Sequence, residues 1–314
     1  MRFSVIIPLY NKAPYLKKAL ESVFGQSFRD FELIVVDDGS IDESYLVAKQ
    51  LLEKSGIKYQ LIHQDNAGVS AARNNGVASS HGDYVCFLDA DDWWAPGFLD
   101  RMNWLICEYP DAGIYGTNYF YVKNGRQRIC VMNAETGYID YCKVYSECMA
   151  MPLTSISVAI DSQLFKEFGG FKKELKLGED FDLWIRIALK YRVVFLNEPL
   201  AYYNQDSNPV WRGIRRLNDP QFHMLWNLGY LESEEKTNPS YKQLIDNLRV
   251  YGLFPYYLSS NFRELAQQEL RKVDWKNQPI KTRCLYKTPI LLLKCRGRLL
   301  AVGSRIKQEI MKHI

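Results

Sequence analysis

Short apolar runs alternate with amphipathic stretches over the first third of the chain. Each run is almost wholly apolar, which is typical of a β-strand buried on both faces. Between the runs, apolar residues recur at helical spacing. After Pro14, for example, Leu16, Leu20 and Val23 share one face, and Gly25 closes the stretch. Strands that alternate with helices predict right-handed βαβ units and a mainly parallel sheet flanked by helices. The predicted strands are residues 3–9, 31–36, 58–63 and 84–88, and the predicted helices are residues 14–25, 42–54 and 69–78.

Polar residues follow each predicted strand. They are Tyr10 and Asn11, residues 37–40, residues 64–66 and residues 89–92. The carboxyl ends of parallel strands meet at one edge of the sheet, so these groups can converge on one ligand. No G-x-G-x-x-G follows the first strand, which excludes the dinucleotide-binding fingerprint. The pattern predicts a nucleotide-binding α/β architecture.

Three carboxylates stand at the end of the fourth strand, in Tyr84-Val-Cys-Phe-Leu-Asp-Ala-Asp-Asp92. Mg²⁺ and Mn²⁺ bind proteins through one or two carboxylates together with substrate phosphates. For an isolated Asp-x-Asp, a solvated acidic turn is the simpler interpretation. The position of Asp89, Asp91 and Asp92 directly after a buried strand favours a metal site.

Composition and charge narrow the classes of protein to which the chain can belong. Of its 314 residues, 47% are hydrophobic and 24% are charged, as in an ordinary globular protein. Residues 281–314 hold nine Lys or Arg and one Asp or Glu. Their net charge of +8, against +4 for the whole chain, leaves −4 for residues 1–280. Polyanion binding is therefore a question about the tail alone, and we expect no nucleic-acid partner.

Cysteines and apolar length indicate the compartment. The seven cysteines are an odd number without a C-x-x-C pair, which favours reduced thiols over a disulfide framework or a zinc site. The apolar run at the N-terminus is too short for a signal peptide, and no run approaches the roughly 20 residues that span a bilayer. We expect a cytoplasmic protein.

The C-terminal part of the chain has a helical pattern. Over residues 216–275 the predicted core residues are Trp226, Leu228, Leu244, Leu248 and Leu265. From residue 289 onward, apolar side chains recur at helical spacing between Lys and Arg: Leu292, Cys295, Leu299, Val302, Ile306, Ile310 and Ile314. Such a basic amphipathic helix can lie on an anionic membrane surface. The alternative is that the apolar stripe docks on its own domain or on a second subunit of a homodimer.

Six motifs occur in an order that resembles the family 2 glycosyltransferases with the GT-A fold. Together they span roughly residues 3–205, and several in register are far more specific than one alone. The motifs are Val5-Ile-Ile-Pro-Leu-Tyr-Asn11, Ile34-Val-Val-Asp-Asp-Gly-Ser40, Asn66-Ala-Gly-Val-Ser-Ala-Ala-Arg-Asn-Asn-Gly76, Gly82-Asp-Tyr-Val-Cys-Phe-Leu-Asp-Ala-Asp-Asp92, Gly169-Gly-Phe171 and Gly178-Glu-Asp-Phe-Asp-Leu-Trp184.

The resemblance implies a donor site for a nucleotide-sugar. It places the nucleoside against residues 8–10, chiefly Pro8 and Tyr10, and against Asp38, although Asp-Gly is also simply a good turn. Further contacts to the base, ribose or phosphates would come from Asp65, Arg73 and Asn74. For Arg73, an ion pair with an aspartate at the strand ends is the alternative. Asp89, Ala90 and Asp91 would form the D-x-D motif of the family. The carboxylate of Asp89 would face the sugar or ribose, and that of Asp91 would bind Mn²⁺ or Mg²⁺. Asp92 would support the metal site or cap a helix near Pro96.

The resemblance also implies the catalytic residues. Asp180 would be the general base and Glu179 would contact the acceptor, at the start of a helix over residues 181–189. Acidic residues also stabilise helix N-termini without any catalytic role, which is the alternative. Neighbouring helix positions do not face each other, so we expect only one of the two carboxylates in the cleft. Trp184 fits either the core or a platform for a sugar ring.

One departure from the family concerns the loop after Pro199-Leu-Ala-Tyr-Tyr203. Many members continue with Arg or His near the diphosphate, whereas this chain has Asn204. The cation is therefore missing or displaced, with Arg212, Arg215 and Arg216 as candidates.

The expectation is a metal-dependent, inverting glycosyltransferase with a UDP-sugar as the favoured donor. Its acceptor would be a glycan or lipid-linked saccharide in cell-surface polysaccharide or lipopolysaccharide assembly, at the inner face of the membrane. The catalytic domain would be residues 1–215, with a nucleotide-sugar-binding half at 1–118 and an acceptor-side half at 119–215. A helical extension at 216–280 and the basic tail at 281–314 would follow. The rivals are a nucleotidyltransferase, whose glycine-rich phosphate loop is missing after the first strand, and a silent sugar-nucleotide binder, against which the intact Asp89, Asp91 and Asp180 argue.

Overall fold

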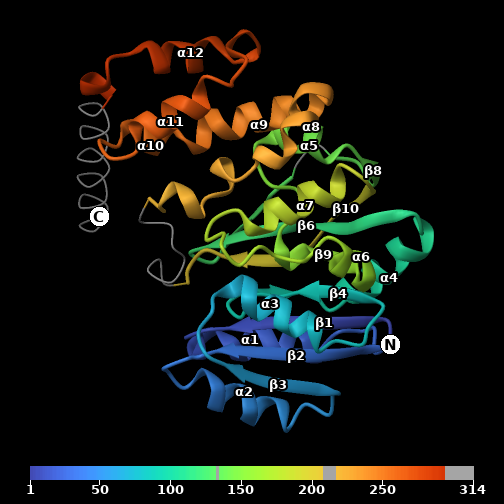
Figure 1. Ribbon diagram of the computed structural model, residues 1–314. Helices are drawn as coiled ribbons and strands as arrows, with labels where there is room; N and C mark the ends of the chain where they lie inside the picture. The colour runs from blue at the N-terminus through green and yellow to red at the C-terminus, as the bar shows by residue number, and fades with distance from the viewer. Residues whose placement is uncertain (132–133, 208–216, 294–314) are drawn as a thin grey trace, which may run out of the picture. The chain divides into compact units, whose positions relative to one another are not determined.

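The computed structural model describes residues 1–131, 134–207 and 217–293. The chain divides into two compact units, the first ending at Ser233 and the second beginning at Glu234 (Figure 1). This division lies beyond the predicted boundary at residues 215/216, because the turns of residues 220–231 belong to the first unit. One of them is tied to it by a β-bridge between Leu177 and His223.

The first unit is built on a sheet of ten strands in the order β3-β2-β1-β4-β9-β6-β10-β5, with β7 beside β6 and β8 beside β10. The first half of the sheet is parallel, as predicted: β1 pairs with β2 and β4, and β2 pairs with β3. The bounds of this half are β1 (Phe3–Leu9), α1 (Ala13–Phe24), β2 (Phe31–Asp38), α2 (Ser44–Leu52), β3 (Tyr59–Gln64), α3 (Val69–Ala78) and β4 (Tyr84–Phe87).

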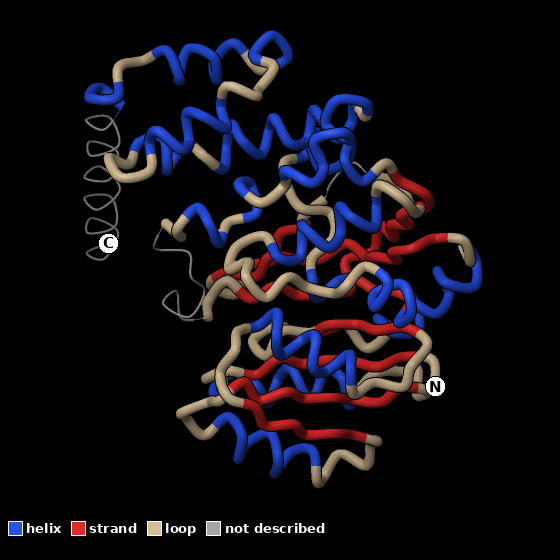
Figure 2. The backbone as a smooth tube through the Cα atoms, in the orientation of Figure 1, coloured by secondary structure: helices blue, strands red, loops and turns tan. Residues whose placement is uncertain are grey.

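Helices cover both faces of this parallel half (Figures 1 and 2). The chain steps outward from β1 to β3 through α1 and α2, which contact each other, and returns past β1 to β4 through α3. Right-handed crossovers therefore place α3 on the face opposite to α1 and α2. Gly76 lets α3 approach closely, since a Cβ at this position would lie 2.4 Å from Cγ2 of Ile6. The mainly parallel α/β fold with flanking helices is confirmed.

The second half of the sheet contains a pattern that the sequence did not predict. A 12-residue strand, β6, pairs with β10 in parallel and with β9 in antiparallel orientation, and β9 joins the two halves through β4. The bounds are β5 (Trp93–Trp94), α4 (Phe98–Glu108), β6 (Ala112–Lys123), β7 (Arg126–Ile129), β8 (Gly137–Ile139), α5 (Tyr141–Cys148), β9 (Val158–Asp161), α6 (Ser162–Glu167), α7 (Glu179–Ala188) and β10 (Arg192–Asn204).

The structure decides the open question about Trp184. Its side chain is fully buried in α7, edge-on to the ring of Phe171 at 5.7 Å between centroids. Trp184 is therefore a core residue, and it presents no ring face to a sugar.

The second unit is helical in its described part, as predicted. Its helices are α9 (Pro239–Gly252), α10 (Phe254–Leu258), α11 (Arg263–Leu270) and α12 (Ile280–Lys287), and α8 (Glu232–Thr237) crosses the division between the units. Leu244 and Leu248 are buried as expected, but Leu265 is 39% exposed and the prediction for it is wrong. The buried face of α11 runs through Ala266 and Leu270, four residues apart, and Leu265 points about 100° away from it.

The predicted basic amphipathic stripe lies almost wholly outside the described residues. Within them, Leu292 is 58% exposed whereas Leu293 is buried. In the described part of the chain no helix is long and apolar enough to span a membrane.

Candidate functional site

The carboxylates that follow β4 are each held by a different partner. Asp91 receives the ammonium group of Lys12 at 2.5 Å, with only 13% of its side chain exposed. Lys12 belongs to the loop between β1 and α1. The predicted metal ligand is therefore a carboxylate that already faces a cation, at the edge of the sheet where the strands end.

Asp92 is buried and joins this loop to the end of β10. Its Oδ1 accepts a hydrogen bond from the backbone N–H of Asn204 at 2.7 Å, and Oδ2 is buried without a partner among the described residues. Burial and the charges of Asp91 and Asp89 raise the pKa of Asp92 well above its ordinary value. The alternative role for Asp92, that of a helix cap, is not observed, because the helix after Pro96 begins at Phe98 with Gly97 as its N-cap. The support of a metal site by Asp92 stays a prediction.

Arg73 is the centre of the site. It lies on α3, is 3% exposed, and donates to Asp89 Oδ1 at 2.7 Å, to Glu179 Oε1 at 3.3 Å and to Ser155 Oγ at 3.2 Å. Burial alone would lower the pKa of Arg73, but the carboxylates of Asp89 and Glu179 raise it. The ion pair with a sheet-end aspartate, given above as an alternative for Arg73, is present. It connects the loop after β4 to the first turn of α7.

Asp180 is half-buried at the start of α7, beside Glu179. The helix begins after Gly178, whose φ of +81° lies in the left-handed region that favours glycine. Burial, followed by the charge of Glu179, raises the pKa of Asp180 to about 7, although Arg73 acts in the opposite direction. Glu179 hydrogen-bonds to Arg73, whereas Asp180 influences Arg73 through its charge and accepts a hydrogen bond from the backbone N–H of Phe181 at 2.8 Å. That only one of the two carboxylates faces the cleft stays a prediction.

Two tyrosines of α5 stand near Asp180, in a region where the sequence offered no motif. Burial, and then charges that include Asp180, raise the pKa values of Tyr141 and Tyr145. The hydroxyl of Tyr141 is buried without a hydrogen-bond partner among the described residues. A hydroxyl group next to a carboxylate of this kind can donate to it or to a bound ligand.

Asp38 organises the loop that precedes α3. Its carboxylate accepts hydrogen bonds from the backbone N–H groups of Ala67 at 2.8 Å and Gly68 at 2.9 Å, and from the side-chain amide of Gln64 at 2.8 Å. A carboxylate has about four acceptor sites, so one remains for a ligand.

The remaining predicted donor-site residues differ in their surroundings. Tyr10, at the end of β1, is 37% exposed, and Pro8 is buried within the strand. Asn74 is tied to Phe171 by two hydrogen bonds, one to its backbone O at 2.7 Å and one from its backbone N–H at 3.0 Å. Asp65 is exposed after β3 and, within the described ranges, forms no hydrogen bond or ion pair. The structure thus brings Arg73, Asp89, Glu179 and Asp180 together and leaves Asp65 apart.

The charge of the site is unbalanced. Five carboxyl groups, those of Asp89, Asp91, Asp92, Glu179 and Asp180, stand against the two cations Lys12 and Arg73. Burial raises the pKa values of Asp92 and Asp180, and the neighbouring carboxylates raise them further. Within the described residues no three acidic, His or Cys side chains are arranged around a common metal position. A divalent cation here would use one or two carboxylates and the phosphates of a ligand.

The sequence analysis missed Lys12, Ser155 and the two tyrosines. A signal was present for Lys12, because it follows Tyr10 and Asn11 at a strand end where anions bind. The other three carry no motif, and only folding brings them to the site. The displaced cation that we sought at Arg212, Arg215 or Arg216 lies outside the described residues.

Solved structures share this architecture. The crystal structure of S. aureus TarS, residues 1–349, in complex with UDP-GlcNAc matches with a TM-score of 0.71 at 21% identity, covering 86% of this chain and 78% of that one. The mannosyltransferase PcManGT from Pyrobaculum calidifontis, in complex with GDP-Man and Mn²⁺, matches with a TM-score of 0.58 at 19% identity, covering 96% and 80%. At these identities the likeness shows the fold.

Sequence comparisons identify the family. Glycosyltransferase GlyA of Streptococcus pneumoniae serotype 4 is 30% identical over 266 residues, which are 78% of this chain and 37% of the relative. The chain spans about a third of the length of the first curated relatives that it matches. Residues 4–147 match the family model described as glycosyl transferase family 2. The resemblance that the motifs indicated is confirmed, and the chain belongs to glycosyl transferase family 2.

Proposed function

We propose that this chain is a metal-dependent, inverting glycosyltransferase that takes a sugar from a nucleoside-diphosphate donor, with a UDP-sugar favoured. The acceptor is a hydroxyl group of a glycan or lipid-linked saccharide in the assembly of cell-surface polysaccharide or lipopolysaccharide. The observation that carries the proposal is the buried Arg73. It ties Asp89, at the strand ends, to Glu179, which stands beside a carboxyl group whose pKa is about 7.

The donor class is supported by two proteins with the same fold. TarS has been crystallised with UDP-GlcNAc, and PcManGT with GDP-Man and Mn²⁺. In this chain we assign the base of the nucleotide to the remaining acceptor site of Asp38 and the ring face of Tyr10. The sugar and diphosphate would extend from there towards Asp89 and Arg73.

Asp91 would hold a Mn²⁺ or Mg²⁺ ion, with Asp89 beside it. The ion would compensate the charge that develops on the leaving diphosphate. A divalent cation suits this position, because the Asp91 carboxylate already binds the ammonium of Lys12 and the site has more carboxyl groups than cations. Lys12 would leave Asp91 when the ion arrives and would then be free to bind a phosphate oxygen.

Asp180 would accept the proton of the acceptor hydroxyl. The hydroxyl oxygen then attacks the anomeric carbon from the side opposite to the diphosphate, the bond to the diphosphate breaks, and the configuration inverts. A general base works best when its pKa lies near the working pH, and the pKa of Asp180, about 7, meets this condition. Glu179, held by Arg73, would contact the acceptor.

The test is nucleotide release from UDP-, GDP- and dTDP-sugars, with Mn²⁺ and with EDTA. We expect metal-dependent release of nucleotide from one of the donors, which would identify the sugar that is transferred. Calorimetry with UDP and GDP is the companion measurement, because it detects a donor site even when hydrolysis without acceptor is slow. Absence of both release and nucleotide binding would overturn the proposal.

For the acceptor, we propose a position at the inner face of the cytoplasmic membrane, reached through residues 289–314 and the net charge of +8 in residues 281–314. Co-sedimentation with phosphatidylglycerol vesicles, lost at high salt, is the expected result. If the chain does not bind the vesicles at any salt concentration, the proposed membrane position is wrong, whereas the proposed donor chemistry is unaffected.

A further inference from the structure

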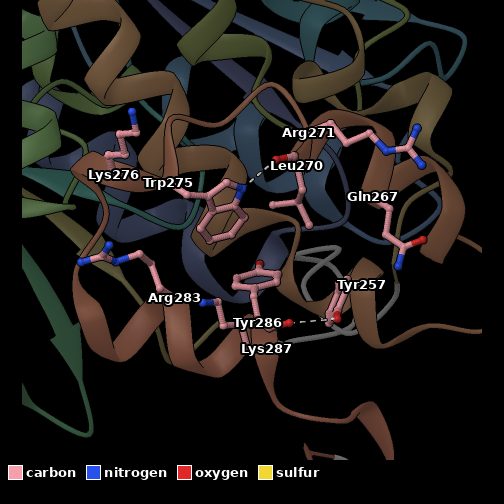
Figure 3. Close-up of a pocket in the computed structure, with 9 residues that line it drawn as sticks. All are labelled: Tyr257, Gln267, Leu270, Arg271, Trp275, Lys276, Arg283, Tyr286 and Lys287. Atoms are coloured by element: carbon pink, nitrogen blue, oxygen red, sulfur yellow. Dashed lines mark hydrogen bonds between the residues drawn. The ribbon is translucent and has the colours of Figure 1, made fainter.

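The second unit contains a cavity of about 610 Å³ among residues of α10, α11, the turn Trp275–Asn277 and α12. Its volume lies within the range of about 300–1,000 Å³ that is typical of ligand pockets. All the described residues that line it belong to the second unit, and none of these belongs to the site described above. Figure 3 shows the pocket, with the rings of Trp275 and Tyr286 next to each other near its centre.

Three aromatic side chains form the apolar part of the pocket. The ring of Tyr286 lies 5.1 Å from that of Trp275 and 5.0 Å from that of Tyr257, measured between centroids. Their polar atoms are bound within the unit: Trp275 Nε1 donates to the backbone O of Leu270, Tyr286 OH to that of Val250, and Tyr257 OH to that of Tyr286. The rings are thereby held in place, and the surface that they offer to a ligand is apolar.

Four cationic residues line the pocket together with these rings, namely Arg271, Lys276, Arg283 and Lys287. In Figure 3, Arg283 and Lys287 lie on one side of the two central rings and Arg271 on the other. Among the described residues none of the four forms a salt bridge, and Nε of Arg283 is buried without a hydrogen-bond partner.

The carboxylates nearest in the chain are engaged elsewhere. Glu235, Asp246 and Glu269 bind Arg249, Lys242 and Lys272 in a separate network. Asp274 accepts hydrogen bonds from the backbone N–H of Lys276 and the side-chain amide of Asn277. The pocket therefore has apolar ring surface and positive charge without a balancing carboxylate from this network.

We propose that the pocket binds an anionic saccharide, a sugar segment of the acceptor glycan that carries carboxylate or phosphate groups. The C–H face of a pyranose ring packs on aromatic rings, and an arginine binds a carboxylate or phosphate through two parallel hydrogen bonds. A saccharide is favoured over other anions because a glycosyltransferase domain shares the chain, and a linked module raises the effective concentration of its ligand. The inference in this respect rests on the proposed function.

The experiment uses the full chain and calorimetric or microscale titration with defined probes at low and high salt. The anionic probes are trigalacturonate and a phosphorylated maltotriose, and the neutral control is maltotriose. We expect the anionic saccharides to bind at least about tenfold more tightly than maltotriose, and salt to remove most of the difference. Inorganic phosphate alone should bind much more weakly, because it makes no contact with the rings.

Single substitutions locate the binding. Arg283→Gln and Trp275→Ala should each weaken binding of the anionic saccharide by about tenfold. The matched controls are Lys281→Gln on the same helix and Tyr251→Ala, because both residues are exposed and neither lines the pocket. We expect these controls to remain within about twofold of the unsubstituted chain. Trp275→Phe replaces Trp275→Ala if thermal unfolding shows that the alanine variant is not folded.

Each outcome bears on the proposal. Equal binding of phosphate and saccharides would overturn it, since the rings would then contribute nothing. Binding to phosphatidylglycerol vesicles without binding to either saccharide would overturn it in favour of a lipid headgroup. Arg283→Gln should leave metal-dependent nucleotide release unchanged. If the unsubstituted chain binds the anionic saccharide but releases no nucleotide from any donor, the result counts against the proposed function alone. If it releases nucleotide but does not bind the anionic saccharide, the result counts against the pocket alone.

Discussion

Two buried arginines, one in each compact unit, show how differently the same residue can be used. Arg73 and Arg249 are each 3% exposed and each binds carboxylates. Around Arg249, the three carboxylates of Glu235, Asp246 and Glu269 meet three cations, because Lys242 and Lys272 complete the set. The cluster around Arg73 has five carboxyl groups and only two cations, with Lys12 as the second.

We interpret the difference as that between an ion-pair network that stabilises the fold and a cluster that, as we propose, binds a ligand. A balanced network lowers the cost of each buried charge, so nothing further is needed. In the unbalanced cluster, burial and then the neighbouring carboxylates raise the pKa values of Asp92 and Asp180, and such shifts are characteristic of functional sites. The balance of charge, rather than the presence of a buried arginine, distinguishes the two regions.

The largest effect that we expect is on turnover. Asp180→Asn removes the base but keeps the size and shape of the side chain, and should reduce sugar transfer by about 10²–10⁴-fold without weakening nucleotide binding. Transfer is measured with the donor identified by the release assay. Asp140→Asn, at the N-cap of α5, is the control and should retain near-normal activity, because asparagine caps a helix as well as aspartate does. Full activity of the Asp180 variant would exclude it as the base.

The two arginines can be compared directly by substitution. Arg73→Met and Arg249→Met should each lower the free energy of unfolding, by up to about 3–5 kcal/mol, because each removes a buried cation from carboxylates that are 26% exposed or less. Arg73→Met should be the more harmful, since Lys242 and Lys272 remain beside the carboxylates at Arg249. Only Arg73→Met should also weaken nucleotide binding by the molecules that are still folded. Urea unfolding measures the free energy of unfolding, and calorimetry on separate, folded samples measures nucleotide binding. Equal losses of binding would contradict the distinction between the clusters.

The pKa of Asp180 predicts the dependence on pH. The base must be ionised, so kcat/KM should rise about tenfold per pH unit up to about pH 7 and then level off. Because the pKa is raised on folding, the stability contributed by this group is fully present at low pH and is lost as the pH rises through about 7. Asp180→Asn should remove that part of the change in thermal stability. A flat activity profile between pH 5 and about pH 8 would contradict the assignment.

The smallest effect concerns Lys12. Lys12→Met removes the cation that competes for Asp91, so Mn²⁺ should bind the donor-free protein about fivefold more tightly. Electron paramagnetic resonance of free Mn²⁺ measures this without turnover. The control is Lys17→Met on α1, where the lysine is exposed and pairs with Glu21. Unchanged Mn²⁺ affinity in the Lys12 variant would indicate that the metal does not bind at Asp91.

Most strands and helices of the parallel half of the sheet were predicted from the sequence. Continuous apolar runs define β1, β2 and β4 because strands buried on both faces need apolar residues at every position. The acidic residues after β4 and at the start of α7 were identified from motifs whose spacing is local. By contrast, the long strand β6 was not predicted, since its pairing with β9 and β10 depends on residues distant in the chain.

The sequence alone therefore determined the fold class, the family and the residue types that carry the chemistry. Only the tertiary structure decided their partners: Arg73 between Asp89 and Glu179, Lys12 on Asp91, and Tyr141 near Asp180. It also decided that Trp184 is core and that Leu265 is exposed. The reason is physical. Strand and helix patterns follow from short-range periodicity, whereas charge balance and pKa follow from distances in space, which a linear sequence does not contain.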